Sequence, residues 1–252
     1  MLAARRRPLG PLVEASSVAA VHRVCAGVGC CVVGVAGDEL RQVAALRTHA
    51  QEFRAKYGHA PPSAVLAKLI ADDAQHASQT GETRPLGVTA FIIGDDYGVV
   101  GSSRRGRNTG PMMALYRVDS TGQFYRCRAA AVGRACEDTS TWLADHLSET
   151  AAGAVTFSAD ASVDHSSPVE EDSEAAELVQ VALRCLLQAG SRQSKRDRTG
   201  DDSKSTERSG GLVGSGPSVD DFQVGVVSAA AGFRFLSTAE LETALNAAVT
   251  SA

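Results

Sequence analysis

The chain has no hydrophobic run that approaches the length needed to cross a membrane, and the apolar run around 30–35 has the length of a strand. It also has no large excess of charge of one sign, since the net charge is −4 over 252 residues. Nothing in that balance favours nucleic acid or an anionic membrane as a partner. We expect no secretory signal, because no apolar segment follows the arginines at 5–7.

Motifs of catalytic, metal and nucleotide sites are missing as well. The sequence has neither the G-x-S-x-G of hydrolases nor the H-E-x-x-H of zinc proteases. The pair Gly27-x-Gly29 lacks the third glycine of a dinucleotide fingerprint, because position 32 is valine. We therefore predict no catalytic residue, no metal site and no cofactor. The histidines are scattered, at positions 22, 49, 59, 76, 146 and 165.

Cysteine pairs at metal-binding or redox spacing are also absent. Six cysteines could form a disulfide framework, but a chain of this length does not need one in order to fold. We expect reduced and mostly buried thiols, which favours the cytosol or the nucleus as the compartment. The cysteines stand at positions 25, 30, 31, 127, 136 and 185.

The strongest structural signal that is present is a strand at 84–94. Arg84-Pro85 opens it, because a proline cannot donate to a strand ladder and suits the first residue. Residues 86–93 are almost all apolar, which is typical of a strand covered on both faces. We therefore predict that this strand is central in a single α/β domain that spans residues 1–252.

A hairpin and two helices are predicted before the central strand. Residues 18–37 have the β-branched content and glycine turn of a β-hairpin. Asp38 is expected to cap a helix that ends near Gly58. Prolines at 61 and 62 then open a second helix that fades at 78–81.

More strands and helices are predicted after the central strand. The loop at 101–110 is basic but lacks the lysine of a P-loop. Residues 190–220 are so polar that burial of their side chains cannot offset the entropy lost on ordering, so we predict a disordered insertion there. The other predicted elements are strands at 113–118 and 123–131 around a type I turn at 119–122, a helix carrying Trp142, a loop at 151–169, a helix at 170–189, strands at 222–227 and 233–236, and a terminal helix opened by a capping box at 237–240.

Short motifs run in one order from about Ser16 to the end of the chain. They are KYG at 56–58, QTGETRPLGV at 79–88, YRVDSTGQF at 116–124, AAAVG at 129–133, TWL at 141–143, VGVV at 224–227 and FRFLSTAEL at 233–241. In this order and spacing, the sequence resembles a proteasome α-type subunit. The pieces around Lys56, 70–72 and Val224 look most like the subunit called alpha type 6, at the first α position of the ring.

The resemblance implies a four-layer αββα sandwich of the N-terminal-nucleophile hydrolase type, used for assembly rather than for hydrolysis. It implies a non-catalytic structural subunit of the 20S core, which contributes to core assembly, gating and ubiquitin-dependent protein catabolism. The implied partners are the other α subunits, the β subunits and regulatory particles, with no nucleic acid and no membrane. The implied location is the cytoplasm and the nucleus.

The sequence departs from the family in two ways. The family's opening helix and first two strands have no counterpart here, so we expect an N-terminally truncated or divergent chain with an irregular end at 1–15. Ala20 stands where many α subunits carry a lysine that receives the C-terminal carboxylate of an activator. This substitution argues against an activator pocket on this chain.

Two alternatives stay open. The chain could be a degenerate or incomplete α-like chain without a role in assembly. It could also be a catalytic β-type threonine peptidase, which needs a nucleophile freed as the N-terminal residue by processing. The second alternative is disfavoured because the sequence has no Gly-Thr-Thr processing site, and its lysines stand only at 56, 68, 195 and 204.

Overall fold

The computed structural model describes residues 1–6, 12–14, 17–81, 83–96, 113–133, 136–152, 176–188, 218–228 and 231–250. The chain divides into two compact units. The first contains Met1–Ala4, Ala20–Ala130 and Val224–Leu236, and the second contains Arg5–Ala19, Ala131–Gln223 and Ser237–Ala252.

The first unit is built on a five-stranded antiparallel sheet in the order β2-β3-β4-β5-β6. The α/β class and the central position of the strand predicted at 84–94 are confirmed, although the strand begins four residues later than expected, because residues 84–87 instead connect it to a helix. The strands are β2 (Val21–Cys25), β3 (Val28–Gly34), β4 (Val88–Asp95), β5 (Met113–Val118) and β6 (Phe124–Cys127).

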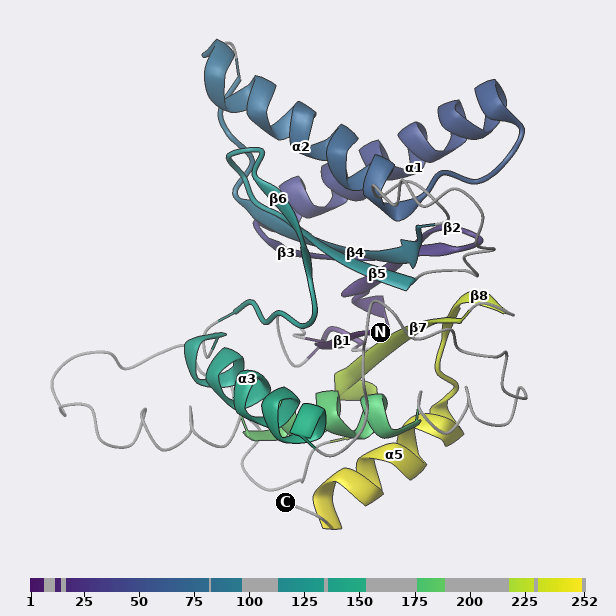
Figure 1. Cartoon of the computed structure of the whole chain (residues 1–252), viewed down its shortest axis with the longest axis vertical. Coiled ribbons are helices and arrows are strands. Elements are labelled where there is room, and N and C mark those ends of the chain that lie inside the picture. The colour runs from purple at the N-terminus through teal and green to yellow at the C-terminus, as the bar shows by residue number, and fades with distance from the viewer. Residues whose placement is uncertain are drawn as a thin grey trace, which may run out of the picture. The chain divides into compact units, whose positions relative to one another are not determined.

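Two helices, α1 (Ala36–Tyr57) and α2 (Ser63–Thr80), cover one face of this sheet (Figure 1). Their buried side chains recur at helical spacing, with Val43, Leu46 and Ala50 on α1. Gly58 ends α1 in the left-handed conformation, as predicted, and its N–H donates to the carbonyl of Arg54 at 2.8 Å. The same core takes in Leu66, Ile70, Val88, Ile92, Tyr116 and Val118.

The expected cap of α1 was wrong. The helix begins at Ala36, so Asp38 lies inside its first turn, and the N-cap residue is Val35, which makes no side-chain capping bond. Asp38 is buried and bonds to the segment before β4 instead, as described below.

The hairpin of β5 and β6 has the predicted turn, with the N–H of Gly122 donating to the carbonyl of Asp119 at 3.0 Å. Gly122 has a φ of 87°, and a Cβ added there would lie 2.6 Å from the Cβ of Gln75 on α2. A glycine is therefore required at this position by both the backbone and the contact with the helix. β6 ends at Cys127, so it is shorter than the strand predicted at 123–131.

A second sheet contains β1 (Leu2–Arg5), β7 (Phe222–Ser228) and β8 (Gly232–Phe235) in the order β1-β7-β8. The strand at Leu2–Arg5 corrects the expectation of an irregular end at 1–15. It escaped the sequence analysis because it is only four residues long and its partner lies more than two hundred residues away.

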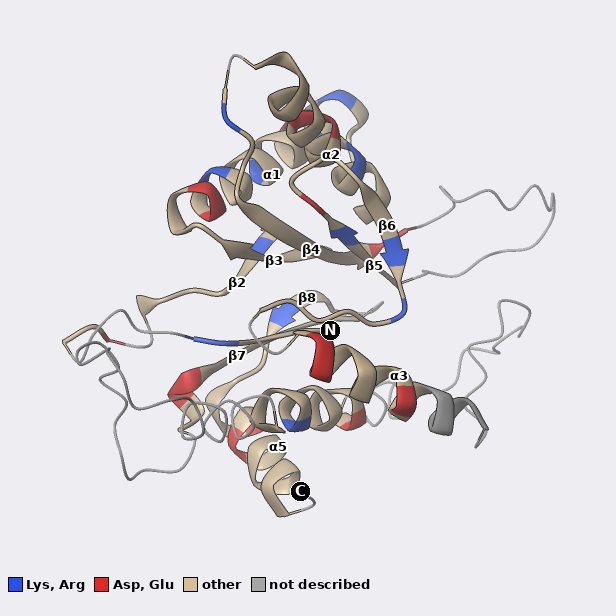
Figure 2. Cartoon of the chain, turned by 90° about the vertical axis from the view of Figure 1, so that its left-hand side faces the viewer, with Lys and Arg blue, Asp and Glu red and all other residues tan. Residues whose placement is uncertain are grey.

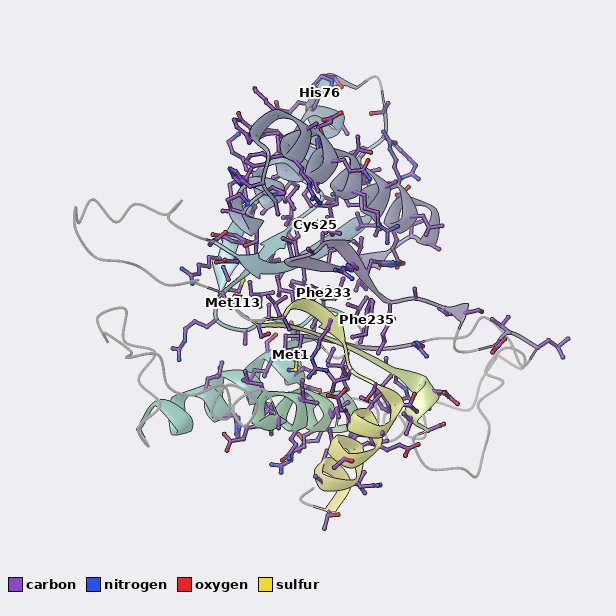
Figure 3. The ribbon with its side chains drawn as sticks, turned by 90° about the vertical axis from the view of Figure 1, so that its right-hand side faces the viewer. Met1, Cys25, His76, Met113, Phe233 and Phe235 are labelled. Atoms are coloured by element: carbon purple, nitrogen blue, oxygen red, sulfur yellow. The ribbon has the colours of Figure 1, made fainter. Side chains whose placement is uncertain are left out.

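Phe233 of β8 packs on the face of the five-stranded sheet that α1 and α2 leave uncovered (Figure 3). Its ring occupies the space where a side chain at Gly29 of β3 would stand, and it comes within 2.6 Å of a Cβ added at Gly225 of β7. Within the first unit, this contact packs the two sheets against each other.

The second unit contains α3 (Cys136–Ala152), a helical segment at 176–188, the short η2 (Val219–Asp221) and α5 (Thr238–Thr250). The capping box is confirmed: the N–H of Ser237 donates to Oε2 of Glu240 at 2.8 Å, and the N–H of Glu240 donates to Oγ of Ser237 at 3.4 Å. The buried positions of α5 include Leu241 and Leu245.

Several predicted segments lie outside the described residues. They are the basic loop at 101–110, the loop at 153–169, the first part of the helix at 170–175 and the insertion at 190–217. None of the described helices combines the length and the apolar character that a membrane crossing requires.

Candidate functional site

Metal-binding side chains do not gather in the described part of the chain, where no three His, Cys, Asp or Glu residues stand together in a way that could hold an ion. The buried polar side chains form two carboxylate clusters instead. One cluster surrounds Asp38 and the other surrounds Asp96, and both lie where the helical hairpin of α1 and α2 meets the five-stranded sheet.

Asp38 receives a two-pronged ion pair from Arg84. The guanidinium nitrogens Nη1 and Nη2 donate to Oδ2 and Oδ1, each at 2.7 Å, and the N–H of Gly87 donates to Oδ2 at 3.0 Å. The hydrogen bond from Arg84, followed by that from Gly87, lowers the pKa of Asp38 to about 2. The cluster ties the first turn of α1 to the residues that lead into β4.

Asp96 accepts hydrogen bonds from both α2 and β5. Its Oδ1 receives the hydroxyl of Ser63 and the N–H of Ala64, each at 2.8 Å, and its Oδ2 receives the hydroxyl of Tyr116 at 2.6 Å. The N-cap residue of α2, Pro62, makes no side-chain capping bond, so Asp96 supplies a carboxylate to that helix end from another element. Burial, and then the bond to Asp96, raise the pKa of Tyr116.

This second cluster contains a hydroxyl and a carboxylate, but it is not arranged for nucleophilic catalysis. Ser63 is fully buried, and its hydroxyl donates directly to Asp96, with no histidine or lysine among its hydrogen-bond partners in the described part of the chain. A nucleophile needs a base and access to a substrate, and this serine has access to neither. We assign both carboxylate clusters to holding the helical hairpin in place.

The histidines named by the sequence are not brought together. His22 lies 3.3 Å from Oε1 of Glu39, His49 lies 2.7 Å from Oδ2 of Asp73, and the ring of His146 stacks on Trp142 at 4.9 Å. The first two pairs join α1 to β2 and to α2. His165 lies outside the described residues.

The six cysteines are unpaired, and two of the buried ones are neighbours on β3. Cys30 belongs to the core under the helices, and Cys31 points to the opposite face, as adjacent strand residues must. Burial raises the pKa of Cys31 to about 12, so this thiol is not activated as a nucleophile. Ala20, which the sequence resemblance matches to a docking lysine, lies directly before β2 and is half-buried.

The face of α1 that points away from the core takes part in neither carboxylate cluster, and we call it the outer face of α1. Leu40 is 65% exposed, and Arg47, Gln51 and Arg54 are also exposed. A leucine is usually buried in a folded chain. The outer face of α1, defined by these four residues, is therefore exposed in the first unit.

Comparisons with known proteins agree on one family. A family model described as "Proteasome subunit" matches residues 1–153, which is more than half of the chain. A protein of Schizosaccharomyces pombe named "Probable proteasome subunit alpha type-1" is 33% identical over 132 residues, covering 52% of this chain and 49% of its own length.

Two further relatives carry α-subunit names. "Proteasome subunit alpha" of Aeropyrum pernix is 29% identical over 133 residues, covering 53% of this chain and 47% of the relative. "Proteasome subunit alpha type-6" of Caenorhabditis elegans is 29% identical over 133 residues, covering 53% of this chain and 49% of the relative. The chain therefore spans about half the length of the curated relatives that it matches.

Proposed function

The chain belongs to the proteasome subunit family, and we propose that it acts as a non-catalytic structural subunit in the α ring of the 20S core. The observation that carries this proposal is the α-subunit name shared by relatives from a yeast, an archaeon and a nematode. The absence of a nucleophile with a base in the described residues is compatible with this role. The geometry favours a structural role, because the buried carboxylates of Asp38 and Asp96 hold α1 and α2 against the sheet.

The proposal extends to the fold and to the place in the ring. We propose that the fold is a four-layer αββα sandwich of the N-terminal-nucleophile hydrolase type. The motifs around Lys56, 70–72 and Val224 favour the first α position, that of alpha type 6. A type-6 subunit is among the relatives, but so are subunits of other α types.

In this role the chain would contribute to core assembly, to gating of the entrance and to ubiquitin-dependent protein breakdown in the cytoplasm and nucleus. The outer face of α1 offers a surface for neighbouring α and β subunits. Ala20 cannot form an ion pair with the C-terminal carboxylate of an activator, so this chain would not provide a lysine-based docking pocket.

Affinity purification of the tagged endogenous protein tests membership of the ring. We expect the other α subunits and the β subunits to co-purify in matching amounts. The control is a tagged Asp96→Ala variant, in which the buried hydroxyls and N–H group of its cluster lose their acceptor, so that the hairpin is misplaced and recovery falls. Recovery of the unaltered chain alone, from cells with intact proteasomes, would favour the alternative of a degenerate α-like chain.

A further inference from the structure

Among the described residues, β6 is the last strand of the five-stranded sheet, with a neighbour on one side only. Phe124 and Tyr125 are 38% and 39% exposed, and Arg126 is exposed as well. Figure 2 shows arginines on both β5 and β6 at this side of the sheet. The sheet therefore ends in an edge with exposed aromatic and basic side chains.

The pairing of β6 with β5 determines which backbone groups face outward. The N–H of Asp119 donates to the carbonyl of Gln123 at 2.9 Å, so this pair begins the ladder. Hydrogen-bonded pairs alternate along antiparallel strands, so the next is Arg117 with Tyr125. The backbone groups of Phe124 and Arg126 consequently point away from β5, and no described residue forms a backbone hydrogen bond with them. These are the groups that an added strand would use.

The charge of this edge is positive and only partly neutralised. Residues 113–133 contain three arginines and a single acid, Asp119. Arg117 holds Asp119 with a bond of 3.1 Å from Nε to Oδ1. Arg126 donates to the carbonyl of Met113 at 3.2 Å, and no salt bridge is recorded for Arg126 or Arg128 among the described residues.

A second copy of this chain does not fit the edge. Pairing two β6 strands would bring Arg126 and Arg128 of both copies to one junction, and arginines at an edge oppose such self-pairing. A segment with acidic side chains would avoid the repulsion between arginines and would form ion pairs with them across the strands.

We propose that β6 accepts an extended acidic segment of a different protein as an added strand. Phe124 and Arg126 are two residues apart and face the same side of the sheet, so they contact two alternate side chains of the partner strand. The partner strand carries an apolar side chain opposite Phe124 and a carboxylate opposite Arg126. Main-chain hydrogen bonds supply affinity, and the carboxylate supplies the choice of partner.

Two capped heptapeptides serve as probes for binding to the full chain. Both consist of threonine, with valine at the third position and either glutamate or lysine at the fifth. We expect the glutamate peptide to bind and to protect the amides of Phe124 and Arg126 from hydrogen exchange, with an affinity that falls as salt is added. The lysine peptide should not bind.

Backbone and charge variants separate the two contributions. Arg126→Pro removes an outward N–H without breaking the backbone bonds to β5. It should weaken binding about tenfold relative to Arg126→Gln, which also loses the side-chain bond to Met113 but keeps the N–H. Should Arg126→Pro fail to fold, the double variant Arg126→Glu with Arg128→Glu leaves the backbone unchanged and should prefer the lysine peptide. Arg41→Gln, at an exposed position on α1, is the matched control and should bind normally.

Three results would overturn the proposal. Equal binding of both peptides would show that charge does not select the partner. Protection of amides from hydrogen exchange away from β6 would show that the peptide binds elsewhere. Self-association of the chain that Arg126→Pro abolishes would assign the edge to a second copy.

Discussion

Gly29 is a residue whose missing side chain leaves room for the ring of Phe233. We predict that Gly29→Ala lowers the free energy of unfolding by about 1–3 kcal/mol, because the added methyl overpacks the contact between the sheets. This corresponds to a fall in Tm of roughly 2–12 °C for a chain of this size. Gly27→Ala is the control, because nothing lies within 4 Å of a Cβ there. Equal melting of the two variants in calorimetry would contradict the prediction.

Asp38 makes stability depend on pH in the acid range. Its pKa in the folded chain is lowered to about 2, whereas an unfolded aspartate titrates near pH 3.9. Its contribution is therefore fully present above about pH 4 and is lost as the pH falls from about 4 to 2. We predict that Asp38→Asn lowers the urea midpoint at pH 7, and that its difference from the unaltered chain narrows below pH 4.

The control for this titration is Asp72→Asn. It removes an exposed ion pair on α2, in which Nζ of Lys68 lies 2.6 Å from Oδ2 of Asp72, four residues along the helix. Exposed pairs of this kind contribute little, so its urea midpoint at pH 7 should stay close to that of the unaltered chain. A pH-independent gap between Asp38→Asn and the unaltered chain down to pH 2 would show that the carboxylate charge is not the stabilising feature.

At the scale of elements, the capping box holds the first turn of α5. Ser237→Ala removes the hydroxyl that caps the helix and should cost about 1 kcal/mol, lowering Tm by about 2–4 °C. The control is Thr243→Ala, an exposed position inside the same helix, where alanine is a better helix former. A variant Ser237→Ala that melts like the unaltered chain would show that α5 does not limit stability.

The elements also show what a sequence can predict. The residues of β5 alternate between half-buried and buried, and the predicted bounds, Met113–Val118, match the observed ones. The capping box and the turn at Gly122 were predictable because their partners lie within four residues. The cluster at Asp96 was not, since Asp96 lies 33 residues from Ser63 and 20 residues from Tyr116 and meets them only after the helices dock on the sheet.

For the whole molecule, we predict that the chain has no peptidase activity. The hydroxyl of Ser63, which donates to the carboxylate of Asp96 at 2.8 Å, is buried and used in packing. Purified protein should neither turn over fluorogenic peptides nor become labelled by a threonine-directed covalent inhibitor. A catalytic proteasome β subunit serves as the positive control. A labelled adduct on this chain, located by mass spectrometry, would support the β-type alternative.

The first unit is assembled from three separate stretches of chain, and the last of them, Val224–Leu236, is synthesised long after 20–130. Translation of the 93 residues at 131–223 that separate them takes on the order of ten seconds. During that interval, the face of β3 that carries Gly29 and Cys31 has no Phe233 to cover it. We expect the nascent chain to need a temporary cover for this face, such as a holdase chaperone, until the strand β8 has left the ribosome.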